Sequence, residues 1–461
     1  MVFSSLTFLL AFLPIVLFIY YLVPMRAKNI VLTIGSLVFY AWGEPVYIIL
    51  MIYSILLNYR FGKLIDKSEK NRKSLFIFTL IINVFILFFF KYYGFVVSVI
   101  NQLFNINLVV REIPLPIGIS FYTFQALSYI IDIYRKKFKP QNNLITFAAY
   151  ITMFPQLIAG PIVRYEDLQE ELVTRKLSLE RLGYGCSRFL YGLCKKVIIA
   201  NSIGALYDSA QLMGNSASVL TGWIGAVSFT FQIYFDFSGY SDMAIGLGHM
   251  LGFSFNENFN EPYKAESITD FWRRWHISLG SWFREYVYIP LGGNRTGVAK
   301  HIRNIMIVWM LTGMWHGAGW NFIIWGLYYG ILLILDKYVL DKIKYFPKFI
   351  RRIITIIEII VGWVIFSSDS VAKILTNLKI MFGFGGLGFV DINAVCLLRT
   401  NLVLLLVCLL LCMGCAKKLY KFIENKKIAM ILIPAVNTFL FLLCCMFLVT
   451  QSYNPFLYFQ F

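Results

Sequence analysis

Histidine is the residue type in this chain best suited to proton transfer at neutral pH, and the sequence has only four: His249, His276, His301 and His316. An imidazole can take the proton from a hydroxyl while that hydroxyl attacks a carbonyl carbon. The chain has no P-loop lysine motif, no His-Glu-x-x-His, no Gly-x-Ser-x-Gly, and no aspartate five positions after any histidine. ATP-driven transport, zinc proteolysis and α/β-hydrolase chemistry therefore lack their signatures, whereas a histidine acting directly on a hydroxyl remains open.

His316 is the first candidate for such a base. It follows an apolar stretch, 304–315, and precedes Gly-Ala-Gly. As a helix, 12 residues rise about 18 Å, which is less than the roughly 30 Å needed to cross a bilayer. If this helix starts at the inner face, His316 lies deep in the membrane, where an ionisable side chain is costly and usually functional. A hydrogen-bonded structural histidine is the alternative that this reasoning leaves open.

His301 and His249 are weaker candidates for a catalytic base. His301 stands between Lys300 and Arg303, so we expect a solvated loop position. His249 follows Gly-Leu-Gly, and we expect a hydrogen-bonding residue at a helix end.

A second cluster of polar residues spans 271–295 and contains His276. Helical spacing predicts that Trp272, His276, Leu279 and Phe283 share one face of a helix. Guanidinium groups pair with phosphate oxygens in bidentate fashion, so the neighbouring side chains suggest a site for a phosphate-bearing donor. The donor-binding candidates are Arg273, Arg274, Arg284 and Trp275. A membrane-surface helix with arginines reaching toward water is the alternative.

The sequence predicts no metal site. Cys412 and Cys415 have the spacing of a redox or zinc motif, but no second cysteine pair or nearby histidine would complete it. Small buried apolar side chains are the expected role of the cysteines.

The composition shows which elements must position these residues. The 461 residues are 59% hydrophobic and only 14% charged, whereas soluble domains carry about 25% charge. Phenylalanine and tyrosine, 43 and 28 residues, outnumber the 42 basic and 24 acidic residues together. Too little charge is present to cover a surface in water, so we expect an integral membrane protein surrounded by lipid.

The net charge of +18 would suit nucleic acid only if the basic residues formed one face. Instead, half of them lie in four short segments beside apolar runs, as in cytoplasmic loops. These segments are 60–73, 135–139, 337–352 and 417–427. We therefore expect no nucleic-acid partner, and placing the four segments in the cytoplasm predicts that both termini lie outside.

The apolar runs predict an all-α, multi-pass helical bundle with roughly ten or more transmembrane helices. Long runs lie near 6–23, 75–90, 114–134, 320–335, 398–415 and 428–450, and shorter ones near 30–42, 46–58, 144–162, 188–206, 219–236 and 353–367. Region 235–320 instead mixes charged residues, glycine and aromatic residues. Polar backbone at membrane depth survives only inside protein or around a water-filled cavity, so we expect broken or re-entrant helices around a central histidine.

With these motifs in view, the chain resembles the membrane-bound O-acyltransferase (MBOAT) family, in its AlgI-like, polysaccharide O-acetylation branch. The resemblance runs nearly end to end as one transmembrane domain, 1–461. The motifs that carry it are Met1-Val-Phe-Ser-Ser, Phe154-Pro-Gln-Leu-Ile-Ala-Gly-Pro161-Ile-Val-Arg164, Phe235-Asp236-Phe-Ser-Gly-Tyr240-Ser-Asp242, 271–295, Met314-Trp-His316-Gly and Asn454-Pro-Phe-Leu-Tyr458-Phe-Gln-Phe461.

The resemblance implies a catalytic core at 235–320, where His316 removes the proton from an acceptor hydroxyl that attacks the acetyl thioester of cytoplasmic acetyl-CoA. His276 is implied to orient or polarise the same centre. Asp236 and Asp242 are candidate orienting partners of either histidine, with helix capping or ion pairing as the alternative. Acetyl-CoA is a substrate, and no permanently bound cofactor is expected.

The C-terminal segment 452–461 resembles the aromatic peptide, with a central tyrosine, that works beside the MBOAT protein of teichoic-acid D-alanylation systems. The resemblance implies that Tyr458 accepts the acetyl group at the outer face and passes it to an SGNH-type acetyltransferase partner. That partner would then modify a polysaccharide. An interfacial belt of aromatic residues is the alternative.

The expected function is therefore O-acetylation of a cell-surface polysaccharide by an enzyme of the bacterial cytoplasmic membrane. One alternative is acylation of a lipid or teichoic acid from a carrier-bound donor, which needs a protein-docking surface. The other is a polysaccharide or lipid transporter with broken helices, which does not require His316 to be reactive.

Overall fold

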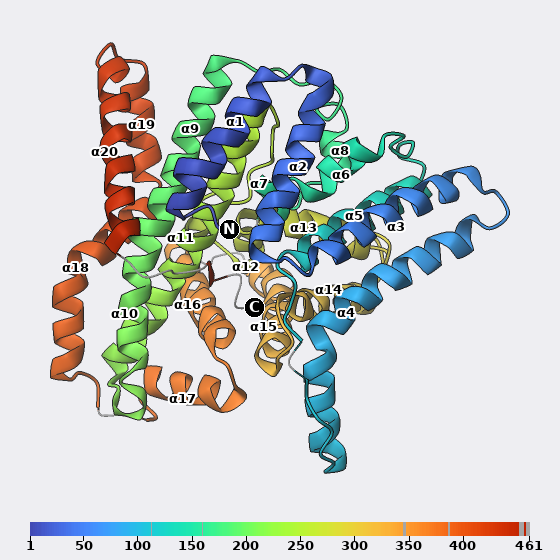
Figure 1. The fold of residues 1–461 in the computed structure, drawn as a ribbon. Coiled ribbons are helices and arrows are strands. Elements are labelled where there is room, and N and C mark those ends of the chain that lie inside the picture. Colours follow the sequence, from blue (N-terminus) through green and yellow to red (C-terminus); the bar gives the residue numbers. More distant parts are fainter. Residues whose placement is uncertain (112, 159, 344–346, 386–387, 451–455, 458–461) are drawn as a thin grey trace. The chain divides into compact units, whose positions relative to one another are not determined.

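The computed structural model describes residues 1–111, 113–158, 160–343, 347–385, 388–450 and 456–457. Helices make up most of this part of the chain, and the described residues contain no β-strand (Figure 1). The expected all-α fold is therefore confirmed. The chain divides into two compact units, Met1–Phe189 with Tyr240–Asn256, and Leu190–Gly239 with Glu257–Phe461.

The first unit begins with the π-helix η1 and continues through a series of helices. Their bounds are η1 (Phe8–Phe12), α1 (Leu13–Leu22), α2 (Met25–Gly43), α3 (Ile48–Lys67), α4 (Arg72–Phe104), α5 (Ile119–Tyr134), α6 (Leu144–Thr152), α7 (Phe154–Leu157) and α8 (Tyr165–Leu168). Two longer helices, α9 (Leu179–Cys194) and α11 (Val219–Leu251), contribute residues to both units. Phe8, Phe12, Phe39 and Phe154 pack ring against ring in the core of this unit.

The second unit holds the remaining helices. They are η2 (Lys195–Ala200), α10 (Asn201–Gln211), η3 (Gly214–Ser216), η4 (Pro262–Lys264), α12 (Ile268–Arg274), α13 (Ile277–Phe283), η5 (Arg284–Tyr288), α14 (Val298–His316), α15 (Trp320–Tyr338), η6 (Leu340–Lys342), α16 (Lys348–Ser367), α17 (Val371–Met381), α18 (Ile392–Cys412), α19 (Cys415–Glu424) and α20 (Ala429–Thr450). Here η2 and η5 are π-helical turns, and η3, η4 and η6 are 3₁₀ turns.

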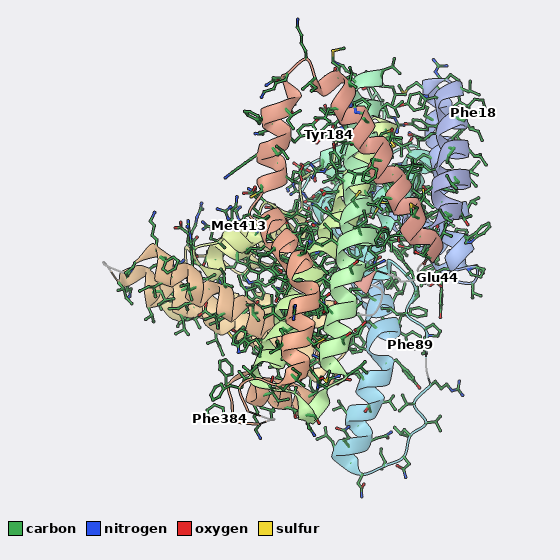
Figure 2. All side chains as sticks on the ribbon, turned by 90° about the vertical axis from the view of Figure 1, so that its left-hand side faces the viewer. Phe18, Glu44, Phe89, Tyr184, Phe384 and Met413 are labelled. Carbon is green, nitrogen blue, oxygen red and sulfur yellow. The ribbon has the colours of Figure 1, made fainter. Side chains whose placement is uncertain are left out.

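Six helical segments of the described chain are long and apolar enough to cross a bilayer. They are Ile48–Lys67, Arg72–Phe104, Leu179–Gln211, Trp320–Lys342, Ile392–Cys412 and Ala429–Thr450. Large apolar side chains such as Phe18, Phe89 and Phe384 lie at the surface, which a lipid-facing protein requires (Figure 2). The membrane prediction is confirmed, while the count of roughly ten holds only approximately because several apolar runs form shorter helices.

The middle of the chain is irregular over a shorter range than expected. Residues 235–251 belong to α11, which runs unbroken for 33 residues. Between Leu251 and Val298 the backbone forms only short helices and turns, the longest being α13 continued by η5, 277–288. The predicted broken helices are therefore present, but they begin after α11.

Candidate active site

His316 is the last residue of α14, where the chain turns through Gly317 into α15. This helix has 19 residues and starts at Val298, so the expected 12-residue helix over 304–315 was too short. The apolar pattern does not show the true start of the helix, because the first two turns of α14 are largely polar. Two glycines bring α14 and α15 together, since a Cβ on Gly313 would lie 3.3 Å from the Cα of Gly326.

The ring of His316 lies in an aromatic cluster and is only 8% exposed. Its centroid is 5.0 Å from that of Trp315, 5.0 Å from Trp325 and 5.3 Å from Phe366, all in edge-on contact. Within the described chain, Nε1 of the fully buried Trp325 has no hydrogen-bond acceptor. A buried donor of this kind is unusual in proteins and leaves an N–H group available beside His316.

His276 lies at the break between α12 and α13, with φ of 46° in the left-handed region. The predicted single helical face through Trp272, His276 and Phe283 is therefore wrong, because the helix ends at Arg274 and restarts at Ile277. Non-glycine residues rarely adopt this conformation, and it persists only where the surroundings enforce it.

Asn258 is one of the groups that hold His276 in place. Its Oδ1 lies 3.2 Å from Nδ1 of His276 and accepts hydrogen bonds from the backbone N–H and the hydroxyl of Ser278, at 3.1 and 2.9 Å. The imidazole also packs edge-on against Phe237, with centroids 4.7 Å apart. His276 lies in a loop outside the spanning helices. Burial lowers its pKa to about 3, so the ring is neutral at physiological pH.

Trp315 connects the two histidines. The ring centroid of His276 is 6.0 Å from that of Trp315, and the Trp315 ring also contacts His316. The structure therefore brings both motif histidines into one aromatic cluster, although they are 40 positions apart in the sequence.

The four donor-binding candidates are in different environments. Arg273 and Arg284 are exposed, whereas Arg274 donates from Nε to Asp270 at 2.8 Å. Trp275 is buried, with its ring 5.0 Å from that of Phe259. The structure thus leaves two arginines open to solvent or lipid headgroups and places Trp275 in the core.

Asp236 forms a buried ion pair with Lys196, at 2.6 Å and with both side chains at most 3% exposed. Its second oxygen accepts the backbone N–H of Leu457 at 2.9 Å. Phe456 is buried beside this pair, with Nζ of Lys196 4.8 Å from its ring centroid. The two described residues of the C-terminal segment, Phe456 and Leu457, therefore contact α11 at Asp236, the residue before Phe237.

Close helix packing makes this ion pair possible. Gly239 lies one turn after Asp236, and a Cβ there would stand 2.7 Å from the carbonyl oxygen of Gly192 and 3.2 Å from N of Lys196. Lys196 itself belongs to the π-helical turn η2, a feature that often occurs at functional sites.

The ion-pairing alternative holds for both aspartates. Asp242, in the first unit, pairs with Arg188 at 2.6 Å. The hydrogen bonds described above join Asp236 to Lys196 and Leu457, and an orienting role of either aspartate toward a histidine remains a prediction.

The remaining histidines differ in how well the sequence predicted them. His249 lies in the last turn of α11, as expected, with its ring 4.8 Å from that of Tyr184. His301 is buried inside α14, so the predicted solvated loop position is wrong. Its two ring nitrogens are 2.8 and 2.6 Å from the hydroxyls of Tyr288 and Tyr338. Lys300 and Arg303 are exposed on other faces of the same helix.

Tyr458 lies outside the described residues, as does most of the segment 452–461. Sequence reasoning missed Lys196 and Asn258 as supports of the site. A lysine within an apolar run is a usable signal because an intramembrane cation needs a partner, whereas nothing marks Asn258.

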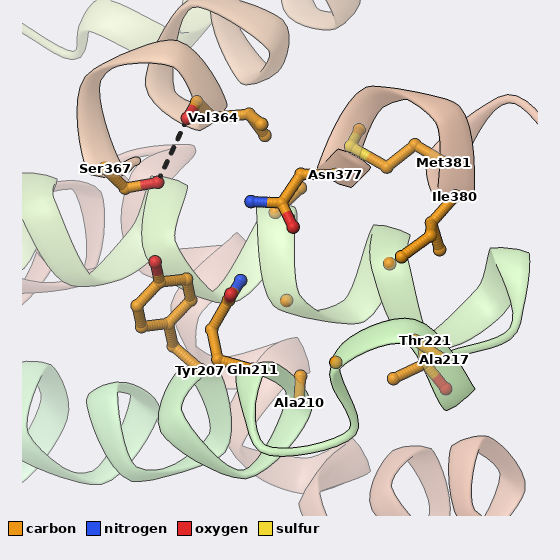
Figure 3. Close-up of a pocket in the computed structure, with 14 residues that line it drawn as sticks. Tyr207, Ala210, Gln211, Ala217, Thr221, Val364, Ser367, Asn377, Ile380 and Met381 are labelled. Atoms are coloured by element: carbon orange, nitrogen blue, oxygen red, sulfur yellow. Dashed lines mark hydrogen bonds between the residues drawn. The ribbon is translucent and has the colours of Figure 1, made fainter. Parts of the chain in front are cut away.

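A small cavity of about 40 Å³ lies in the second unit, between α10, α11 and α17. The side chains of Tyr207, Gln211 and Asn377 point toward it (Figure 3). Such a volume holds little more than a few water molecules, so this cavity is too small for a nucleotide or a glycan.

Comparison with known proteins places these features in context. A sequence profile of the membrane-bound O-acyltransferase family matches residues 135–376. A probable alginate O-acetylase, AlgI, of Azotobacter vinelandii is 42% identical over 403 residues, 85% of this chain and 80% of its own length. The peptidoglycan O-acetyltransferase of Helicobacter pylori is 35% identical over 85% of this chain and 82% of its own. The teichoic acid D-alanyltransferase of Bacillus subtilis is 30% identical over 53% and 65%.

Proposed function

Because this chain belongs to the membrane-bound O-acyltransferase family and is an acyltransferase enzyme of a membrane, we propose that it carries acetyl groups from cytoplasmic acetyl-CoA to an acceptor outside the cell. The acetyl group then serves O-acetylation of a cell-surface polysaccharide. The family domain, 1–461, has its catalytic core within 235–320.

The names of the relatives support an acetyl group and a glycan. Two are an alginate O-acetylase and a peptidoglycan O-acetyltransferase, and both are similar over 85% of this chain. The basic segments support an orientation with both termini outside a bacterial cytoplasmic membrane, which places acetyl-CoA and acceptor on opposite sides.

In this proposal His316 is the general base. An imidazole nitrogen of His316 takes the proton of the acceptor hydroxyl while that oxygen attacks the thioester carbonyl carbon. The C–O bond forms, the C–S bond breaks, and the thiol of CoA leaves with a proton. The aromatic cluster excludes bulk water, which protects the thioester from hydrolysis.

His276 and Trp325 are proposed to support this step. Trp325 supplies the indole N–H that we assign to the developing negative charge on the carbonyl oxygen. His276, fixed by Asn258 and in contact with Trp315, orients the centre. The exposed Arg273 and Arg284 are the candidates for the phosphates of CoA.

The observation that carries the acceptor side of the proposal is the position of Phe456 and Leu457. Leu457 is hydrogen-bonded to Asp236, and the next residue of α11, Phe237, packs on His276. In the sequence, Tyr458 is the residue that comes directly after this segment. This supports Tyr458 as the hydroxyl that receives acetyl and passes it to an SGNH-type partner.

The test uses purified enzyme in liposomes with labelled acetyl-CoA, and maps covalent acetyl by peptide mass spectrometry. We expect label on Tyr458 in the unaltered enzyme and none in His316→Ala or Tyr458→Phe. His249→Ala, which alters a histidine in the first unit, is the matched control and should retain the label.

Three outcomes would overturn parts of the proposal. Release of CoA without label on Tyr458 would assign the acceptor hydroxyl to a partner protein. Neither label nor CoA release, with the partner supplied, would favour a carrier-bound donor, as the similarity to a D-alanyltransferase suggests. Loss of polymer export in His316→Ala cells would favour a transporter.

A further inference from the structure

Two cations are buried together in the first unit, away from any carboxylate partner in the described chain. Lys28, in the first turn of α2, is 5% exposed, and Arg175, in the loop before α9, is 6% exposed. Neither forms an ion pair with an acidic side chain among the described residues. A buried charge is strongly destabilising unless it is paired, so this pair needs a physical explanation.

The contacts of Lys28 leave its charge uncompensated. Its Nζ donates to the backbone carbonyl of Tyr20 and lies 4.6 Å from the centroid of the Tyr20 ring. These are contacts with a dipole and a π face. They orient the ammonium group but supply no negative charge.

Arg175 has donors to spare. Its Nη2 donates to Oδ1 of Asn29, while Nε and Nη1 are buried and have no acceptor in the described chain. The guanidinium carbon lies 4.4 Å from the ring centroid of Phe253 and 5.8 Å from that of Tyr20. Glu171 lies close enough to act on Arg175 electrostatically, but its carboxylate accepts the N–H of Ser254 at 2.9 Å.

The surrounding backbone holds this arrangement in place. The hydroxyls of Tyr20 and Tyr21 donate to the carbonyls of Leu251 and Met250, at 2.6 and 2.7 Å, which ties the end of α1 to the end of α11. Gly252, with φ of 87°, then turns the chain so that Phe253 covers Arg175. A Cβ at Gly252 would lie 3.2 Å from Cγ of Arg175, so the position requires glycine.

A helix N-terminus adds to the positive potential. Lys28 lies in the first turn of the 19-residue α2, where free backbone N–H groups carry partial positive charge. Arg26 and Lys176 are exposed beside the buried pair. Burial lowers the pKa of Arg175, and the nearby Glu171 opposes this shift only in part.

We propose that Lys28 and Arg175, with the first turn of α2, bind a phosphate group. Phosphate has several charged oxygens, so one group can accept from an ammonium and from two guanidinium nitrogens at once, which a chloride or a single carboxylate does less well. Under the orientation proposed above, the site faces the cytoplasm. The phosphate then belongs either to an anionic phospholipid or to CoA.

The test measures thermal unfolding of the full chain in the phosphate-free detergent dodecyl maltoside and separates the two sources. Micelles of the detergent alone are compared with micelles that also contain phosphatidylglycerol, and CoA or dephospho-CoA is added to the first kind. A rise in the unfolding temperature with phosphatidylglycerol identifies the lipid. A rise with CoA but a smaller one with dephospho-CoA identifies the nucleotide phosphate.

Arg175→Met and Lys28→Met should abolish that rise, whereas the exposed neighbour Lys176→Met should keep it. In dodecyl maltoside without lipid or CoA, Arg175→Met should unfold at a higher temperature than the unaltered protein, because it removes a buried cation that has no ion-pair partner. Arg175→Lys retains the charge but has fewer hydrogen-bond donors. We expect this variant to bind the phosphate-bearing ligand about tenfold more weakly, which would reduce the rise in unfolding temperature.

The proposal fails if neither phosphatidylglycerol nor CoA raises the unfolding temperature, or if Arg175→Met responds as the unaltered protein does. If Arg175→Met does not fold, the same comparison with Arg175→Lys decides the question. Acetyl transfer is not the readout, so a failure of the proposed function leaves the result unaffected.

Discussion

The contact between Asp236 and Leu457 allows a sharp test of how the C-terminal segment is held. Asp236 divides its two oxygens between Lys196, at 2.6 Å, and the N–H of Leu457, at 2.9 Å. A hydrogen bond to a charged acceptor contributes about 1.5–3 kcal/mol. Since 1.4 kcal/mol corresponds to a factor of ten, loss of the carboxylate should raise the population of the detached segment by about 10- to 150-fold.

Hydrogen–deuterium exchange reads this population directly. In Asp236→Asn, exchange of the C-terminal peptide containing Leu457 should accelerate by about 10- to 150-fold, because the amide is exposed whenever the segment detaches. The variant also leaves Lys196 buried without its partner, which should cost about 3–5 kcal/mol of stability. Lys196→Met in the same chain removes that cation, so the double variant should regain stability while exchange at Leu457 stays fast.

Asp242→Asn is the matched control. It also breaks an ion pair, with Arg188, but Asp242 belongs to the first unit, whereas Leu457 belongs to the second. Unchanged exchange at Leu457 in Asp236→Asn, or an equal acceleration in Asp242→Asn, would refute the reasoning.

Three further predictions concern the histidine cluster and the helices that carry it. Burial lowers the pKa of His276 to about 3, so between about pH 6.5 and 3 the unfolded chain binds a proton that the folded chain does not. The free energy of unfolding should therefore decrease by about 1.4 kcal/mol for each unit that the pH is lowered over this range. His276→Gln removes this group, and its unfolding temperature should depend less on pH. Trp325→Phe keeps the aromatic ring but loses the N–H, and it should lower kcat for acetyl transfer by about 10²- to 10³-fold without changing the unfolding temperature greatly; an unchanged kcat would remove Trp325 from the mechanism. Gly313→Ala should lower the unfolding temperature because its Cβ meets α15, whereas the exposed Gly183→Ala should raise stability by about 0.5–1 kcal/mol; a loss of stability in both would contradict this account.

The sequence predicted the membrane-embedded helical fold because composition and apolar runs are properties of single segments. It also predicted His276 and His316 as the residues to examine, from motif and membrane depth. The break at His276 was not predicted because the apolar pattern continues across both short helices. The break depends on Asn258, which lies 18 residues away in the sequence.

His301 shows the same limit from the opposite direction. Charged neighbours in the sequence indicated solvent, yet neighbouring residues on a helix face different directions, and His301 faces Tyr288 and Tyr338. Lys196 and Asp236 are 40 residues apart, and only their contact in three dimensions reveals that each neutralises the other.

The π-helical turn at Lys195–Ala200 also constrains how this protein can change during evolution. An α-helix advances about 100° per residue, so a turn that accommodates one extra residue alters the angular phase between the helical stretches before and after it. Loss of one residue here would rotate the following turns of α10 by about that angle while leaving their composition and hydrophobicity untouched. We therefore expect a deletion in this turn to be tolerated less well than a substitution on the lipid-facing side of the same helix.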